Sequence, residues 1–335
     1  MSKINSLYLQ LFRRTDKPYI PLLRIFLVLI SLKELITVSH KFRAYFSEPV
    51  LFYRSDALTD ALYALFSSYP TQFFYLFVIV GCFAALGLMT RWTLSIYALT
   101  YLMVIYFDTS TGIYNHETGL SVQILLVLSM APGIKNFSLD NLIKNRFQFN
   151  SWLKIESYND WGLKLIMLLI VLGYFTAGVS KIRYGTFNWM DGETLSYYLS
   201  GQASFLNPVA QKFIPVSESV DWKGTNGIVA YTYGNFQSKP QLIEWTKILS
   251  KSDWLMSLLS VVTILFELGA LGILFWKPYR VFFLLSAVGF HFSIRLFMGL
   301  GFLDYQVICL CLVDWPYLYS YLTNLIKWIK QKMTF

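Results

Sequence analysis

The chain has 335 residues, of which 56% are hydrophobic and 18% aromatic, while only 14% are charged. Soluble globular chains carry about a quarter charged residues, so this composition excludes an ordinary water-soluble domain and indicates an integral membrane protein. The net charge of +9 could indicate nucleic-acid binding, but the basic residues stand beside apolar segments and form no nucleic-acid motif. We therefore expect the lipid bilayer as partner and no nucleic acid.

Eight apolar segments follow one another along the chain. Each is a candidate transmembrane helix, because a helix needs about 20 mostly apolar residues to cross the hydrocarbon core. The fourth and eighth segments are short, and the first contains three charged residues. We expect an all-α polytopic protein of the cell membrane, a bundle of about eight transmembrane helices. The segments are 22–37, 73–89, 92–107, 118–131, 161–179, 254–276, 281–298 and 300–313.

The basic residues sort the connecting segments into two groups. If the eight segments alternate in direction, five parts of the chain share one side of the membrane. They are the N-terminal segment, the connections near residue 91, at 132–160 and at 277–280, and the C-terminal segment. These segments are rich in Lys and Arg, whereas the short connections of the other side carry neither. Because cytoplasmic loops of membrane proteins collect Lys and Arg, we expect both termini in the cytoplasm.

Two longer connections fall on the expected outer side, at about 38–71 and 181–252. After Pro316, residues 317–333 place Lys327, Lys330 and Lys332 near Leu322, Ile326, Trp328 and Ile329, which predicts an amphipathic helix lying at the membrane interface. The sequence contains no internal repeat, which disfavours an inverted-repeat transporter. We expect a single transmembrane domain over residues 1–335.

Ionisable side chains at membrane depth are expensive, so each is a candidate functional residue. Lys181 follows an aromatic-rich apolar segment that also contains small residues. It could reach out to the interface, as lysines near helix ends commonly do, or be a desolvated amine that acts as a base. His116, preceded by Asn115, stands before the fourth segment; a lone histidine there is more commonly structural than functional.

The later segments add further polar candidates. Glu267 lies in the middle of the sixth segment, and His291 and Arg295 share one face of the seventh, four residues apart. A purely structural interpretation pairs Arg295 with Glu267 or Asp304. Trp189 and Asp191 belong to a turn directly after Lys181, which alone carries little information. No set of His and Cys has the spacing of a zinc site, so we expect no metal.

Four sequence elements, taken in order, resemble the HTTM family, the transmembrane domain of vitamin K-dependent gamma-glutamyl carboxylases and their bacterial relatives. The elements are Asn115-His116, the stretch from Tyr174 through Ala-Gly-Val-Ser to Lys181 with Trp189-Met-Asp-Gly192, Glu267-Leu268, and His291 with Leu296-Phe297 and Gly301-Phe302. Together they cover about two-thirds of the chain. Each element alone is weak, and their common order makes the resemblance specific.

The resemblance implies a chemistry for these residues. In the carboxylases, the lysine that matches Lys181 deprotonates reduced vitamin K, and oxygen converts the quinol anion into a base strong enough to remove a gamma proton from a substrate glutamate. Carbon dioxide then adds to the carbanion. The histidine that matches His116 stabilises developing charge. By resemblance, Lys181 and His116 are catalytic, reduced vitamin K or menaquinol is the cosubstrate, and Asn115, Trp189, Asp191, Glu267, His291 and Arg295 are supporting polar residues.

The sequence departs from the carboxylases in one respect, because their long lumenal C-terminal domain has no counterpart here. Short members of the family resemble the sporulation-delaying protein B-like proteins. We therefore consider two functions. One is a carboxylase-like enzyme acting at the outer membrane face on a secreted peptide or protein. The alternative is an accessory protein for maturation or export of a secreted antimicrobial peptide, without carboxylase activity.

Overall fold

The structure, a computed structural model, describes residues 13–47, 56–110, 116–200, 240–298 and 301–333. Within these ranges nearly all regular structure is helical, which confirms the expected all-α class. The exception is a pair of two-residue strands, β1 (Arg14–Thr15) and β2 (Tyr158–Asn159), which pair antiparallel. They join the N-terminal segment to the chain directly before α9 (Trp161–Gly185).

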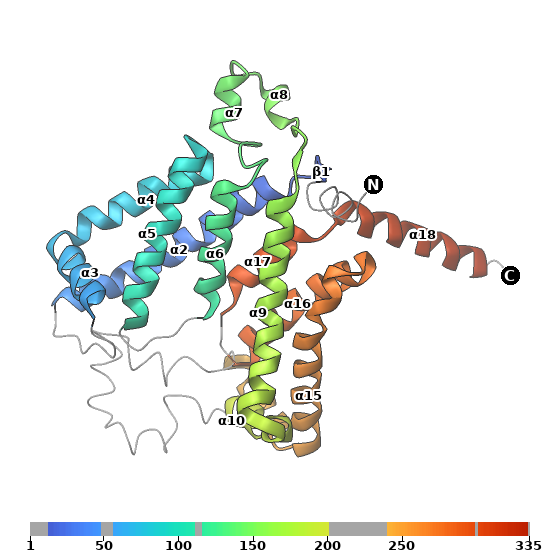
Figure 1. The fold of residues 1–335 in the computed structure, drawn as a ribbon. Coiled ribbons are helices and arrows are strands. Elements are labelled where there is room, and N and C mark those ends of the chain that lie inside the picture. Colours follow the sequence, from blue (N-terminus) through green and yellow to red (C-terminus); the bar gives the residue numbers. More distant parts are fainter. Residues whose placement is uncertain (1–12, 48–55, 111–115, 201–239, 299–300, 334–335) are drawn as a thin grey trace, which may run out of the picture.

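The N-terminal half is a layer of packed helices (Figure 1). In this layer α2 packs against α4, α4 against α5, and α5 against α6. Helices α3 and α4 meet at Tyr69 at an angle of 95°. The polar chain after α6 forms two short helices that cap one end of the bundle. The bounds are α2 (Tyr19–Ser47), α3 (Ala57–Ser68), α4 (Pro70–Leu86), α5 (Thr90–Ser110), α6 (His116–Met130), α7 (Leu139–Lys144) and α8 (Phe149–Leu153).

The C-terminal half is built around α9, which packs against α6 on one side and against α15 on the other. A short helical segment folds back at the end of α9, and α17 completes the bundle by packing against both α16 and α2. The bounds are η1 (Thr186–Asp191), α10 (Glu193–Leu199), η3 (Pro240–Leu242), α14 (Ile243–Leu249), α15 (Asp253–Gly269), η4 (Ala270–Leu274), α16 (Lys277–Met298), α17 (Leu303–Leu312) and α18 (Trp315–Met333).

All eight predicted apolar segments overlap helices, but they differ in length and character. In the described ranges three helices are long and apolar enough to cross a membrane: Trp161–Gly185, Asp253–Leu274 and Lys277–Met298. The bent pair of α3 and α4 would make a fourth if it counts as one span. Helix α17 has 10 residues, so it is about 15 Å long, half the thickness of the hydrocarbon core. Three candidate spans are therefore shown, and eight stay a prediction.

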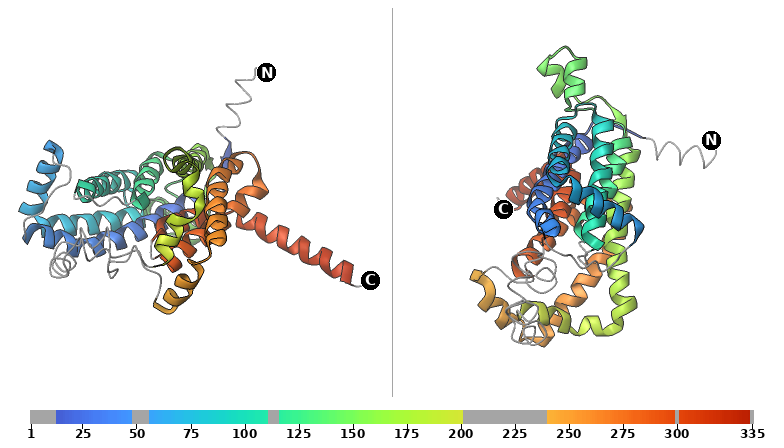
Figure 2. Two further views of the ribbon diagram at one scale, coloured as in Figure 1. Left: turned by 90° about the horizontal axis from the view of Figure 1, so that it is seen from below. Right: turned by 90° about the vertical axis from the view of Figure 1, so that its left-hand side faces the viewer.

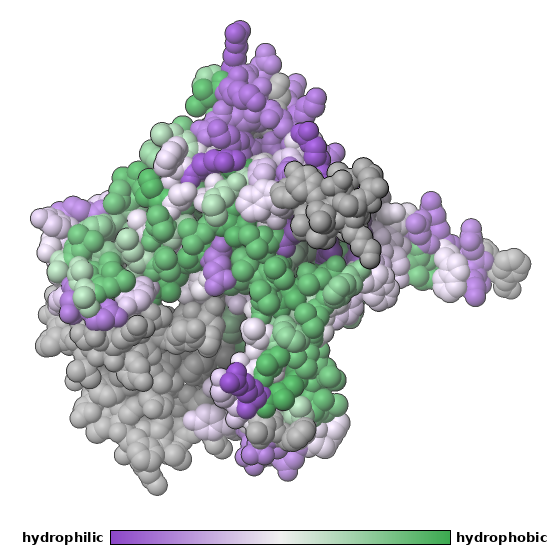
Figure 3. Space-filling view, in the orientation of Figure 1, coloured by the Kyte–Doolittle hydropathy of each residue, from purple (hydrophilic) through white to green (hydrophobic). Residues whose placement is uncertain are grey.

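The surface supports this assignment. A broad apolar band crosses the middle of the molecule, and hydrophilic surface covers both ends (Figure 3). Many large apolar side chains are exposed, among them Trp92, Leu265 and Phe282. An apolar surface of that extent is of the kind that lipid covers.

Two of the predicted loops contain more helix than expected. Residues 38–71 include the end of α2 and all of α3, and α9 continues four residues past Lys181 before η1 begins. Residues 201–239 of the second loop lie outside the described residues. The expected C-terminal helix is confirmed as α18, which extends away from the bundle in Figures 1 and 2. Its position at a membrane interface stays a prediction.

Candidate functional site

The candidate site centres on an ion pair between Lys181 of α9 and Glu267 of α15. The Lys181 Nζ atom donates hydrogen bonds to both carboxylate oxygens of Glu267, at 2.7 and 2.8 Å. The Glu267 side chain is 7% exposed and that of Lys181 is 22% exposed. The two residues are 86 positions apart in sequence. The sequence identified both as candidates, but it did not pair them.

A glycine lets the two helices approach closely enough for this pair. Gly178 lies three residues before Lys181, on the same face of α9. A Cβ atom at Gly178 would lie 3.1 Å from the Glu267 Cβ and 3.1 Å from the Leu268 Cδ2. The short separation between α9 and α15 therefore depends on glycine at this position.

The turn after α9 covers the ion pair. The Lys181 Nζ atom lies 5.1 Å from the centre of the Trp189 ring, within the range of a cation–π contact. Gly185 makes room for the Trp189 side chain, since a Cβ there would be 2.8 Å from the Trp189 Cβ. At the end of the turn, Gly192 has a φ of +86° and lies against the backbone of Met256 in α15. The tryptophan is thus positioned by glycines at both ends of η1.

Asp191 caps this turn and does not face the ion pair. Its Oδ1 accepts a hydrogen bond from the Glu193 backbone N–H at 2.8 Å, and its carbonyl accepts one from the Ser257 Oγ at 2.5 Å. Its side chain is exposed. The geometry thus makes Asp191 a residue that holds η1 and α15 together.

A second polar pair lies deeper in the bundle. The Tyr174 Oη and the His291 Nε2 are 2.6 Å apart, and both residues are buried. Tyr174 is seven residues before Lys181, two helical turns along the same face of α9. The His291 Nδ1 atom is buried and has no hydrogen-bond partner within the described ranges. Around the pair stand the rings of Phe266, Phe283, Phe290, Phe302 and Tyr305.

The sequence motif includes Tyr174, but the sequence does not predict its hydrogen bond to His291. The available signal was its spacing from Lys181, which places both on one helix face. Burial of Glu267 and His291 agrees with the expectation that charged and polar groups of the late helices point into the bundle.

Arg295 is the exception among these residues. We expected it to face the bundle interior with a carboxylate partner, but its side chain is exposed and makes no ion pair within the described ranges. Glu267 pairs with Lys181 instead. Asp304 is buried and accepts a hydrogen bond from Ser121. Arg295 is about one turn after His291 on α16, and the neighbouring helices cover only the histidine.

The expected partnership of Lys181 with His116 is not tested. Asn115 lies outside the described residues, and for His116 the structure gives only its place as the first residue of α6. Helix α6 begins toward the end of the bundle at which α9 finishes (Figure 1). Both residues are thus toward one end of the molecule.

The site offers a proton donor and acceptor pair next to an aromatic environment. An ammonium group in this geometry donates hydrogen bonds and cannot accept a proton, so Lys181 acts as a base only after giving a proton to Glu267 or to another acceptor. Within the described ranges no group of three His, Cys, Asp or Glu side chains could hold a metal ion. Comparison with protein-family models, curated proteins and solved structures found no match to this chain.

Proposed function

We propose that this chain is a multi-pass membrane protein of the HTTM type in which Lys181 and Glu267 transfer a proton during the modification of a secreted peptide or protein. The reaction class is that of the gamma-glutamyl carboxylases, with a reduced quinone as cosubstrate. The observation that carries the proposal is the doubly hydrogen-bonded Lys181–Glu267 pair buried between two apolar helices.

The position of this pair argues for more than a structural role. Removing two charges from water costs several kcal/mol per ion, and apolar residues of similar volume are commonly as stable or more stable. Most of the buried residues of α9 and α15 are apolar, among them Ile170, Met256 and Ile264. A sequence that needed only packing here could use Leu or Met.

In the proposed reaction Glu267 accepts the proton of the Lys181 ammonium, and the neutral amine then takes a proton from an acidic hydroxyl of the cosubstrate. Both partners become neutral together, which avoids an isolated charge in the bundle. Trp189 lies over the amine in cation–π contact. Proton transfer by a positioned side chain contributes about 10²–10⁴-fold to a reaction rate.

The Tyr174–His291 pair and the rings around it offer the kinds of group through which a quinol binds. Its ring requires aromatic or apolar faces, and its hydroxyl groups require hydrogen-bond partners. The rings around Tyr174 supply the aromatic faces. The buried His291 Nδ1, which has no partner among the described groups, is available as a hydrogen-bond partner for a hydroxyl. When bound, a reduced quinone would supply the acidic hydroxyl and, with oxygen, the oxidising chemistry.

The decisive test is a carboxylation assay on protein reconstituted in liposomes with menaquinol, oxygen, labelled bicarbonate and a glutamate-rich peptide. We expect wild-type protein to fix label and Lys181→Arg to lose about 10²-fold or more, because guanidinium stays protonated and cannot act as a base. Lys181→Ala should be equally inactive. An arginine variant with wild-type activity would identify Lys181 as an interfacial anchor.

A charge exchange separates catalysis from structure. The double variant Lys181→Glu with Glu267→Lys keeps an ion pair between α9 and α15, so its thermal stability should recover relative to either single variant. The proposed chemistry should not recover, because the amine then stands on the wrong helix.

The accessory function makes the opposite prediction for the assay. A protein that only assists maturation or export of an antimicrobial peptide fixes no label, and Lys181→Arg then supports peptide release in a producing strain as well as wild type does.

A further inference from the structure

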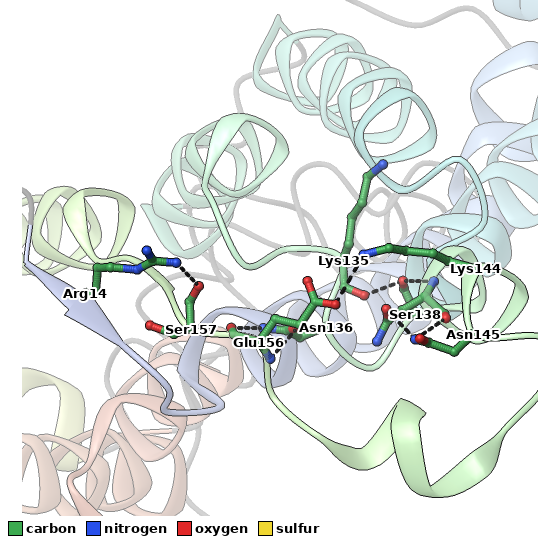
Figure 4. A network of polar contacts seen from close by, with 9 residues as sticks. Arg14, Lys135, Asn136, Ser138, Lys144, Asn145, Glu156 and Ser157 are labelled. Carbon is green, nitrogen blue, oxygen red and sulfur yellow. Dashed lines mark hydrogen bonds and ion pairs between the residues drawn. The ribbon is translucent and has the colours of Figure 1, made fainter.

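A basic cavity lies at the end of the molecule opposite to Trp189, between the start of α5, the chain after α6 and the paired strands β1 and β2 (Figure 4). Its volume is about 650 Å³. Three cationic side chains line it, Arg14, Arg91 and Lys135, together with the carboxylate residue Glu156. The cavity is therefore large enough for a small polar ligand and carries an excess of positive charge.

The wall of this cavity is held by hydrogen bonds between distant parts of the chain. Asn136 Nδ2 donates to the Glu156 carbonyl at 3.1 Å, and the Glu156 N–H donates to the Asn136 Oδ1 at 3.2 Å. An Nη2–H of Arg14 donates to the Ser157 carbonyl at 3.0 Å. These bonds appear as dashed lines in Figure 4. The site is thus preorganised by the backbone of two segments about 20 residues apart.

The three cations of the cavity wall outnumber the carboxylates that act on them, which are Glu156 in the lining and Asp140, which interacts with Lys135 at longer range. The Glu156 carboxylate pairs with Lys144, at 3.2 Å, rather than with a cation of the cavity wall. Arg14, Arg91 and Lys135 are exposed, and none forms an ion pair with a carboxylate of the described ranges. Arg14 uses part of its guanidinium for Ser157 and has further N–H groups to offer. Guanidinium and ammonium groups together are the usual ligands of phosphate.

The surroundings indicate where a phosphate would come from. Met89 and Trp92, on either side of Arg91, are 62% and 71% exposed. An exposed tryptophan beside an arginine is typical of the level of lipid headgroups, where apolar and polar surfaces meet. Figure 3 shows that the hydrophilic cap of the molecule borders the apolar band. A soluble anion would not require exposed apolar residues next to Arg91.

We propose that the basic cavity binds a phosphate group, and that an anionic phospholipid supplies it. Arg91 and Lys135 contact the phosphate, Arg14 closes the far side, and the acyl chains leave the cavity past Trp92. Cationic pockets at the ends of membrane helices bind anionic headgroups by this combination of charge and apolar surface.

The test measures binding of short-chain phosphatidylglycerol to detergent-purified full-length protein, by native mass spectrometry and by the shift of the melting temperature. We expect phosphatidylglycerol to bind more tightly than phosphatidylcholine of equal chain length. Each interfacial cation contributes about fivefold to the affinity for anionic lipid, so Arg91→Gln with Lys135→Gln should weaken binding roughly 25-fold. Lys154→Gln is the matched control, because this exposed lysine lies in the same connection but does not line the cavity.

Several outcomes decide the proposal. Unchanged affinity in the double variant, or an equal loss in Lys154→Gln, would show that general surface charge accounts for binding. Inorganic phosphate or glycerol 3-phosphate that binds as tightly as phosphatidylglycerol would overturn the lipid as source. If the double variant unfolds, the single variants Arg91→Gln and Lys135→Gln are measured instead, each with an expected loss of about fivefold.

Discussion

At the scale of single residues, the ion pair of Lys181 and Glu267 is the least exposed of the ion pairs that the structure describes. Each charge is stable in this place only because the other is present. Glu267→Leu should therefore lower the free energy of unfolding by about 3–5 kcal/mol, since it leaves the ammonium group without its partner. Glu267→Gln keeps a hydrogen-bond acceptor and should cost less. Denaturation in mild detergent, followed by tryptophan fluorescence, measures both.

The matched control is the double variant Lys181→Met with Glu267→Leu. It removes both charges and fills the space with apolar atoms, so most of the lost stability should return. A double variant as unstable as Glu267→Leu alone would mean that the loss comes from packing around α15 and not from an unpaired charge.

The sequence predicts some residues of this site but not their partners. Lys181, Glu267 and His291 could be found because charged and polar groups are rare within apolar segments. Their partners could not, because Tyr174 and His291 are separated by 117 positions and only the packing of α9 and α16 joins them. Arg295 was placed wrongly for the same reason: a helical face is defined by the sequence, but how much of it is covered depends on the neighbours.

At the scale of elements, the contact between α9 and α15 depends on one glycine. Gly178→Ala places a Cβ 3.1 Å from Glu267 and Leu268, so one helix has to move by a few tenths of an ångström. We expect a loss of about 1–3 kcal/mol in the free energy of unfolding, together with a weakened ion pair. Thermal denaturation of the purified variant in detergent measures this.

Gly173→Ala serves as the control in the same helix. Its Cβ would meet only the Tyr305 Oη, at 3.8 Å, which is an ordinary contact. Because alanine also favours helix over glycine by about 1 kcal/mol, Gly173→Ala should be neutral or stabilising. Equal losses at the two positions would contradict the close approach of α9 and α15.

A second element-scale contact fixes the turn between α4 and α5. The Asp140 carboxylate, in α7, accepts hydrogen bonds from the Met89 N–H at 2.7 Å, the Thr90 N–H at 2.9 Å and the Thr90 Oγ at 2.8 Å. Partial burial raises the pKa of this carboxyl, but these hydrogen bonds outweigh that effect and bring its pKa below the ordinary value of 3.8. The folded state therefore favours the ionised form.

The lowered pKa of Asp140 determines how the stability of the protein changes with pH. A carboxyl whose pKa is lower in the folded state stabilises the protein above its unfolded pKa, and this stability is lost as the pH falls through the folded pKa. Asp140→Ala should thus cost about 1–3 kcal/mol near neutral pH and progressively less below pH 3.8. Glu244→Ala, which removes a largely exposed ion-pair partner, should cost little at any pH. Melting temperatures measured across this range compare the two.

The helices themselves were predicted with uneven success, and length explains the difference. Helix α9 contains all of its predicted segment, because residues 161–179 include a single charged side chain, Lys164, and are long enough to cross a membrane. Helix α3 was missed, because 12 amphipathic residues after the N-cap Asp56 resemble a loop until their apolar face is seen to pack on α5. Short helices depend on tertiary contacts, which single-sequence patterns do not contain.

At the scale of the whole molecule, the segments that the basic residues assign to the cytoplasm meet at one end of the bundle. Lys17 and Lys277 both pair with Asp314, at 2.5 and 3.0 Å. These contacts bring together the N-terminal segment, the start of α16 and the connection between α17 and α18. Arg14 adds the chain before α9 through Ser157, and Asp140 adds the turn before α5. Five segments distant in sequence therefore share one end.

Because these five segments share one end of the bundle, the membrane topology can be tested directly. Paired residues cannot lie on opposite sides of a bilayer. Reporter fusions at Lys144 and after Phe335 must therefore report the same side of the membrane. The positive charge of these segments predicts that this side is the cytoplasm. A fusion at Glu244 in α14 should read external, since the Ser196 hydroxyl bonds the Ser250 carbonyl at the opposite end of α9 from these segments. Alkaline phosphatase and fluorescent-protein fusions report the two sides independently. Opposite signals at Lys144 and Phe335 would contradict the arrangement of the helices in the bundle. An external signal at both positions would agree with that arrangement but reverse its orientation in the membrane. The basic cavity would then lie at the outer face.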